Sequence, residues 1–255
     1  MNMPTTLDAI VVGAGFAGLY ALKKLRDDLG LKVLVFDTAS GVGGTWHWNR
    51  YPGALSDSET HFYCYSWDPD LLQEWDIKTR YVTQPEILKY LEHVAERYNL
   101  YPDIRLRTGV TAAAFDDATD RWLVSTDDGL HYSAKYLVTA VGLLAATNVP
   151  DIPGHDKFKG EVYHTSRWPE NATVVGKRVG VIGTGSSGVQ TITAIAPDVK
   201  HLTVFQRSAQ YSVPSGQGPF TAERVNAIKA NYISYGTTRR TRPWRTGSSS
   251  VRFPR

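Results

Sequence analysis

The chain of 255 residues has a single cysteine, Cys64. It can form no internal disulfide, and it lacks the paired cysteines of redox-active disulfide enzymes. No apolar run approaches the roughly 18 residues needed to cross a bilayer. The first residues, Met1 to Thr6, show neither the basic nor the apolar part of a targeting segment. We therefore expect a cytoplasmic protein with one buried free thiol.

Acidic residues are missing from the last part of the chain. Residues 236–255 hold six arginines and no Asp, Glu or Lys, whereas the other 235 residues carry 22 Lys and Arg against 25 acids. The net charge of +3 thus belongs to the tail, because the remainder has a charge of −3. We expect neither a nucleic acid nor a membrane as partner of the main body.

What the sequence does have is a pair of Gly-rich turns. The first, Gly13 to Gly18, follows the apolar run Asp8 to Val12 and leads into a helix predicted from Phe16 to Arg26. A second apolar strand, residues 32–36, ends at Asp37, which is 19 residues past Gly18, near the spacing of an acid that binds an adenosine ribose. The glycines let the backbone approach a pyrophosphate, and the helix N-terminus offers it free N–H groups. The alternative is a plain tight turn between strand and helix. The residues predicted to hold this dinucleotide are Gly13, Gly15, Phe16, Gly18 and Asp37.

The second turn repeats the first. Residues 177–182 predict a strand, 189–196 a helix and 201–205 the next strand, with Gly183 to Gly188 between the first two. Gln206 takes the position of Asp37, and Arg207 follows it. An acid there would repel a 2′-phosphate, whereas an arginine can donate two hydrogen bonds to it, so we expect NADP(H) here instead of NAD. The predicted contacts are Gly183, Thr184, Gly185, Ser186, Ser187, Gly188, Gln190, Arg207 and Ser208.

The remaining pattern completes an α/β fold with two Rossmann-like dinucleotide-binding units. Thr83 and Glu86 form a capping box for an amphipathic helix, and residues 104–140 alternate as strands with a hairpin turn at Asp128-Gly129. The expected organisation has four parts: a first nucleotide-binding domain at 1–142, a linker at 143–170, a second nucleotide-binding domain at 171–234, and a basic tail at 235–255.

Two further motifs carry a resemblance to a known family. One is G-x-W-x-x-x-x-Y-P-G-x-x-x-D, given by Gly44, Trp46, Tyr51-Pro-Gly53 and Asp57. The other is F-x-G-x-x-x-H-T-x-x-W-P, given by Phe158, Gly160, His164, Thr165, Trp168 and Pro169. The chain resembles the type I Baeyer-Villiger monooxygenases from residue 7 to about residue 234, closest to the cyclohexanone monooxygenase branch.

This resemblance implies FAD at the first turn, NADPH at the second, and the conversion of a ketone to an ester or lactone with O2. It implies that Asp57 is the catalytic carboxylate, which in the family pairs with an arginine beside the flavin. It also implies that the linker motif couples the two domains. His164 could instead be a general base or a metal ligand, but no further ligand lies at a suitable spacing, so we expect no metal. The further FAD contacts implied are Gly44, Thr45, Trp46, Asp57, Tyr63 and Val110.

The family members are about twice as long as this chain. The tail from about Tyr235 has two interpretations: a basic segment that binds nucleic acid, or the product of a shifted reading frame. We prefer the second, because a shift of the frame restores an acidic and apolar stretch. We therefore expect an incomplete chain that binds FAD weakly at most and forms no lactone. The alternative functions are a flavin-dependent N- or S-oxygenating monooxygenase and a non-catalytic nucleotide-binding remnant.

Overall fold

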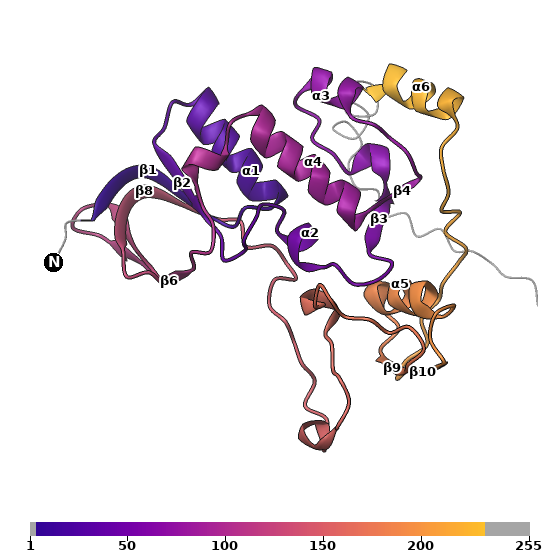
Figure 1. The fold of residues 1–255 in the computed structure, drawn as a ribbon. Coiled ribbons are helices and arrows are strands. Elements are labelled where there is room, and N and C mark those ends of the chain that lie inside the picture. Colours follow the sequence, from indigo (N-terminus) through magenta and orange to yellow (C-terminus); the bar gives the residue numbers. More distant parts are fainter. Residues whose placement is uncertain (1–3, 233–255) are drawn as a thin grey trace, which may run out of the picture. The chain divides into compact units, whose positions relative to one another are not determined.

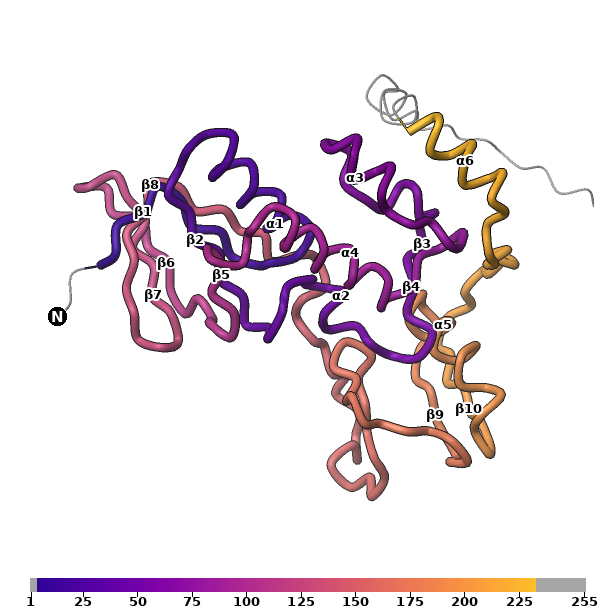
Figure 2. Tube along the Cα trace, turned by 45° about the horizontal axis from the view of Figure 1, so that its top comes forward, coloured from indigo at the N-terminus to yellow at the C-terminus, as the bar shows by residue number. Residues whose placement is uncertain are grey.

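A computed structural model describes residues 4–232 (Figures 1 and 2). Contacts divide these residues into two compact units, one formed by 4–55 with 83–212 and the other by 56–82 with 213–232. The basic tail at 235–255, with its proposed change of reading frame, lies outside the described residues.

The first unit is built on a six-stranded sheet in the order β5-β2-β1-β8-β7-β6. Strands β5, β2, β1 and β8 run parallel, and β7 and β6 are antiparallel. The α/β fold with a parallel Rossmann-like sheet is therefore confirmed. The strands are β1 (Thr5–Val12), β2 (Val33–Phe36), β5 (Ile104–Arg105), β6 (Val110–Asp116), β7 (Arg121–Thr126) and β8 (His131–Thr139).

The sheet contributes an apolar core because its central strands carry β-branched and aromatic residues on both faces. Leu7, Ile10 and Phe36 pack with Val124 and Tyr132. The β7–β8 hairpin turns at the predicted place, where Gly129 adopts a φ of +78°. That conformation favours glycine, which explains the Asp128-Gly129 pair.

Two helices lie side by side in the first unit (Figure 1). Helix α1 (Phe16–Lys23) continues as a π-helical turn, η1 (Lys24–Asp28), and α4 spans Gln84–Arg97. The rings of Phe16 and Tyr90 lie 6.2 Å apart between them. Thr83 is the N-cap of α4, as predicted, but its side chain makes no capping hydrogen bond. Pro85 in the first turn has no N–H, which lowers the need for such a cap.

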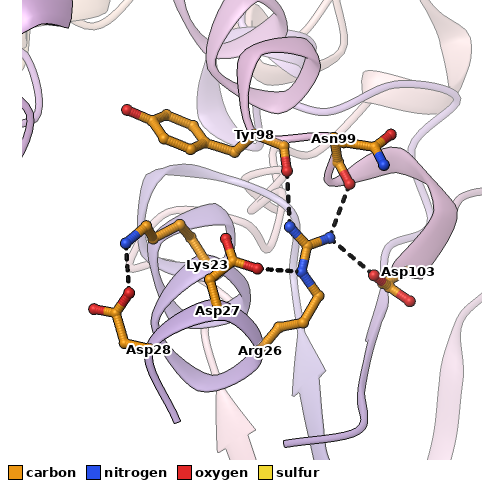
Figure 3. A network of polar contacts seen from close by, with 7 residues as sticks. All are labelled: Lys23, Arg26, Asp27, Asp28, Tyr98, Asn99 and Asp103. Atoms are coloured by element: carbon orange, nitrogen blue, oxygen red, sulfur yellow. Dashed lines mark hydrogen bonds and ion pairs between the residues drawn. The ribbon is translucent and has the colours of Figure 1, made fainter. Parts of the chain in front are cut away.

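Arg26 joins the end of η1 to the end of α4 (Figure 3). Its guanidinium donates to the carbonyl oxygens of Tyr98 (2.7 Å) and Asn99 (2.8 Å), and to Asp103 Oδ2 (2.9 Å). A cation at this place satisfies carbonyls that the helix end leaves open, and it complements the negative end of the helix dipole.

The repeated strand-turn-helix of this unit contains a small parallel pair of strands, β9 (Arg178–Ile182) and β10 (His201–Phe205), with α5 (Ser186–Ile195) between them in the sequence. These bounds agree with the prediction to within three residues. The other short elements of the unit are α2 (Thr45–Trp48), η3 (Tyr101–Asp103), η4 (His155–Lys157) and η5 (Thr165–Arg167).

The second unit combines two distant stretches of the chain. Leu72 and Ile77 pack against Ile228 and Tyr232, and Cys64 lies partly buried against this cluster. Burial raises the pKa of the Cys64 thiol to about 11, so the thiol is inert at neutral pH. The elements are β3 (Leu55–Glu59), η2 (Thr60–Phe62), α3 (Pro69–Glu74), β4 (Tyr81–Thr83) and α6 (Ala222–Ala230).

Across residues 4–232, none of the helices combines the length and the apolar character needed to cross a membrane.

Candidate dinucleotide-binding sites

Only glycine fits at two positions of the first turn. Gly13 has a φ of +107°, and a Cβ there would lie 2.4 Å from the carbonyl oxygen of Ala140. A Cβ on Gly18 would lie 1.8 Å from the carbonyl oxygen of Gly13. The first glycine therefore permits the turn, and the third permits helix α1 to pack against it.

Asp37 is oriented by the same turn. Its Oδ2 accepts a hydrogen bond from the backbone N–H of Ala14 (2.6 Å), and its Oδ1 accepts one from Ala39 (2.8 Å). A carboxylate has about four acceptor positions, so capacity remains for ribose hydroxyls. Asp37 thus lies at the carboxyl end of β2, where a nucleotide binds in open α/β sheets.

The second turn has the same geometry. Gly183 has a φ of +98°, and a Cβ on Gly188 would lie 2.4 Å from the carbonyl oxygen of Gly183. The middle glycines, Gly15 and Gly185, are the N-caps of α1 and α5, with φ of −84° and −72°. These φ values suit any residue, so the backbone conformation alone does not require glycine at either middle position.

Gln206 occupies the place that Asp37 has in the first turn. Its Nε2 donates to Thr184 Oγ1 (3.0 Å), and Thr184 corresponds to Ala14. An amide therefore replaces the acid beside the second turn. Arg207 and Ser208 follow Gln206 and are exposed, so they are accessible to a phosphate. Ser186 and Ser187 lie in the first turn of α5.

The two turns differ in what surrounds them. A Cβ on Gly15 would lie 3.4 Å from the Cα of Gly44, so the loop after β2 closes over the first turn. Within the described part of the chain, a Cβ on Gly183 or Gly185 would meet no atom within 4 Å. The second turn is therefore the more open of the two.

The loop after β2 brings the start of the G-x-W motif to the first turn. Gly43 N–H donates to the carbonyl of Ala14 (2.9 Å), and Gly44, with a φ of +53°, begins the short helix α2 that carries Thr45 and the buried Trp46. The carbonyl of Trp46 accepts from Gln84 Nε2. Gly44, Thr45 and Trp46 are thus placed beside Gly15 by backbone contacts.

Other predicted FAD contacts lie elsewhere. Val110 begins β6 and packs against the core cluster that contains Phe36, next to the end of β2. Asp57 and Tyr63 belong to the second compact unit. Their approach to a flavin ring therefore stays a prediction.

His47, in α2, is a buried polar residue of the same loop. Burial lowers the pKa of His47, and the positive charge of Arg50 lowers it further. The neutral imidazole is therefore favoured in the folded chain.

The linker motif forms a locally closed turn. His164 Nδ1 accepts from the backbone N–H of Ser166 (3.2 Å) and lies 2.8 Å from its hydroxyl oxygen. The rings of Trp168 and Tyr163 lie 5.2 Å apart. A Cβ on Gly160 would lie 2.6 Å from the ring of Phe158, but that ring is exposed and can shift, so this contact alone does not require glycine. Among residues 4–232 no group of three or more His, Cys, Asp or Glu side chains is arranged to hold a metal.

The end of the linker contacts the loop after β2. The guanidinium carbon of Arg167 lies 4.1 Å from the ring centroid of Trp48, and Arg50 pairs with Glu170. Sequence reasoning did not find these contacts. Arg50 and Glu170 are 120 residues apart, and a single sequence carries no signal that would pair them.

Comparison with known proteins agrees with this geometry. Residues 10–242 match the model of the pyridine nucleotide-disulphide oxidoreductase family, and the chain belongs to this family. It is 58% identical over 232 residues to the cyclohexanone 1,2-monooxygenase of Acinetobacter sp, covering 91% of this chain and 43% of that protein. It is 52% identical to a phenazine N-monooxygenase of Lysobacter antibioticus, covering 91% and 43%.

Solved structures show the same relationship. The cyclohexanone monooxygenase from Rhodococcus sp. Phi1 bound to NADP+ has a TM-score of 0.90 and 57% identity, over 92% of this chain and 44% of that one. The structure of OTEMO in complex with FAD and NADP has a TM-score of 0.85 and 38% identity, over 91% and 45%. The resemblance to Baeyer-Villiger monooxygenases predicted from the motifs is thereby confirmed. The chain spans less than half the length of these relatives.

Proposed function

We propose that this chain supplies the FAD- and NADPH-binding part of a Baeyer-Villiger monooxygenase that converts a cyclic ketone to a lactone with O2. One observation carries the proposal. The chain contains two glycine turns of similar backbone geometry. They differ in the residues that follow the next strand, which are Asp37 beside the first turn and Gln206-Arg207 beside the second.

The chain's own residues bind and orient the two cofactors. The N–H groups at the start of α1 and α5 face each pyrophosphate, Asp37 accepts from the FAD ribose, and Arg207 donates to the 2′-phosphate of NADPH. FAD, when bound, supplies the redox and oxygen-activating chemistry. Gly44, Thr45 and Trp46 form one wall of the flavin site, to which we also assign Asp57 as the catalytic carboxylate and Tyr63. The linker residues Phe158 to Pro169 couple the two sites.

The relative from Lysobacter antibioticus favours a second candidate, because it oxygenates nitrogen and shares 52% identity with this chain. An N-oxygenating monooxygenase would use both dinucleotide turns in the same way. The motif with Gly44, Trp46 and Asp57, together with Trp168-Pro169, favours the Baeyer-Villiger function over this second candidate. A ketone as the substrate and a cytoplasmic location are parts of the proposal.

A chimeric protein tests the proposal. Residues 7–232 would replace the matching part of the Acinetobacter cyclohexanone monooxygenase, whose other residues complete the enzyme. We expect NADPH-dependent formation of ε-caprolactone from cyclohexanone, with no N-oxide from phenazine. N-oxide without lactone would favour the second candidate. A chimera that folds and binds both nucleotides but forms neither product would support the non-catalytic nucleotide-binding alternative.

A further inference from the structure

The loop between β2 and β3 contacts the first dinucleotide turn and the helix that follows the second turn. At its start, Gly44 lies against Gly15 of the first turn. Further on, residues 51–55 lie against α5, the helix of the second turn. We call residues 44–55 the bridging loop. Figures 1 and 2 show the chain passing from α2 to α5 along this route.

Gln190 holds the bridging loop with both ends of its side-chain amide. Its Oε1 accepts from the hydroxyl of Tyr51 (2.8 Å) and, at 3.4 Å, from the backbone N–H of Leu55. Its Nε2 donates to the carbonyl of Leu55 (3.2 Å). Gln190 was expected from the sequence to touch the second dinucleotide. In the structure its polar atoms bind the bridging loop, and its contact with a dinucleotide stays a prediction.

The backbone of the loop also lies directly on α5. Gly53 has a φ of +79°, and a Cβ there would lie 2.6 Å from the carbonyl oxygen of Gln190 and 2.8 Å from the Cβ of Ala194. Only glycine fits this contact, so the loop backbone packs directly against α5. Gln190 lies one helical turn past Ser186, where α5 begins and where its free N–H groups face a ligand.

We propose that Gln190 is a positioning residue that couples the two nucleotide sites through the bridging loop. A dinucleotide that orders the N-terminus of α5 also fixes Gln190, and Gln190 fixes Tyr51 and Leu55. The other end of the same loop forms the wall beside the first turn. Occupancy of the second turn therefore changes the affinity of the first turn, and the reverse holds to the same extent. This inference rests on the proposed binding of FAD and NADP(H).

The first test measures the dissociation constant of FAD with and without saturating NADP+ for the 255-residue chain. Wild type is expected to show a ratio of about 5 or more. Gln190→Ala should bring that ratio to within about twofold of one, whatever its effect on the affinity for each nucleotide alone. Thr193→Ala is the matched control, because Thr193 lies on α5 with its side chain exposed and hydrogen bonded to the carbonyl of Val189. The inference would be overturned if Gln190→Ala showed the same ratio of FAD dissociation constants as wild type. It would also be overturned if NADP+ did not change FAD binding in wild type.

The second test needs no nucleotide. Amide hydrogen exchange of residues 51–55 should be about fivefold faster in Gln190→Ala than in wild type, because one net hydrogen bond is lost. Thr193→Ala should leave this exchange unchanged. Unchanged exchange in Gln190→Ala would refute the role of Gln190 even if no nucleotide binds. Failure of both nucleotides to bind, in contrast, would be seen in the direct titrations and would count against the proposed function.

Discussion

At the scale of the residue, we propose that the side chain of Arg207 selects NADPH over NADH. Arg207 is exposed directly after Gln206, which contacts Thr184 of the second turn. Loss of a charge-assisted contact to a phosphate costs about 1.5 to 3 kcal/mol. Arg207→Ala should therefore weaken NADPH binding roughly 10- to 150-fold and leave NADH nearly unchanged, as measured by titration.

Arg178→Ala provides the control for this experiment, because Arg178 begins β9, at the end of the strand away from the turn. It should leave both affinities near wild type. Equal losses of NADPH and NADH in Arg207→Ala would show that Arg207 stabilises the fold and does not select the cofactor.

His47 gives the folded chain a dependence on pH. Its pKa in the folded chain lies below the ordinary 6.5, because of burial and Arg50, and the opposing charges of Asp37 and Glu170 do not cancel these effects. A lowered pKa contributes stability that is complete above 6.5 and is lost as the pH falls toward the folded-state pKa. In His47→Gln, the free energy of unfolding should therefore fall less than in wild type between about pH 7.5 and about pH 5.5.

Thermal unfolding across this pH range measures the effect. The substitution His155→Gln, at an exposed histidine of η4, is the control and should keep the wild-type profile. A His47→Gln profile as steep as that of wild type would place the pH dependence in other groups.

At the scale of the element, Arg26 ties η1 to the end of α4. Arg26→Ala removes the hydrogen bonds to Tyr98, Asn99 and Asp103 and should lower the free energy of unfolding by about 1 to 3 kcal/mol. Arg26→Lys should lose less, because it keeps the charge near the helix end but cannot reach all three acceptors. Urea unfolding measures the free energy of unfolding of both variants. A loss below about 0.5 kcal/mol in Arg26→Ala would mean that water replaces the guanidinium at no cost.

The elements that the sequence predicts well are those with local causes. The strands β1 and β9 and the glycine turns after them follow from apolar runs and from φ values that only glycine adopts. The missing side-chain cap at Thr83 was not predictable from the pattern, because the capping box does not take Pro85 into account. The bridging loop was identified by its glycines and aromatic residues, but its contacts with Gln190, Arg167 and Glu170 join residues more than 100 positions apart.

At the scale of the whole molecule, the sequence predicted the repeated strand-turn-helix but not the grouping of residues 56–82 with 213–232. This grouping depends on apolar contacts such as Leu72 and Ile77 with Ile228, which carry no local signature. The domain boundaries at 142 and 170 remain a prediction.

The central claim is that the two turns take different dinucleotides, and a matched pair of substitutions tests it most directly. Gly15→Ala and Gly185→Ala both introduce a Cβ at the start of a helix, at a φ that alanine adopts readily and without a contact shorter than 3.4 Å. FAD and NADP+ would each be titrated against wild type and both variants, with circular dichroism as the check on folding. The account predicts that Gly15→Ala weakens only FAD and that Gly185→Ala weakens NADP+ far more than FAD. The account would be contradicted if either substitution weakened the binding of both nucleotides equally. It would also be contradicted if Gly185→Ala weakened the binding of FAD alone.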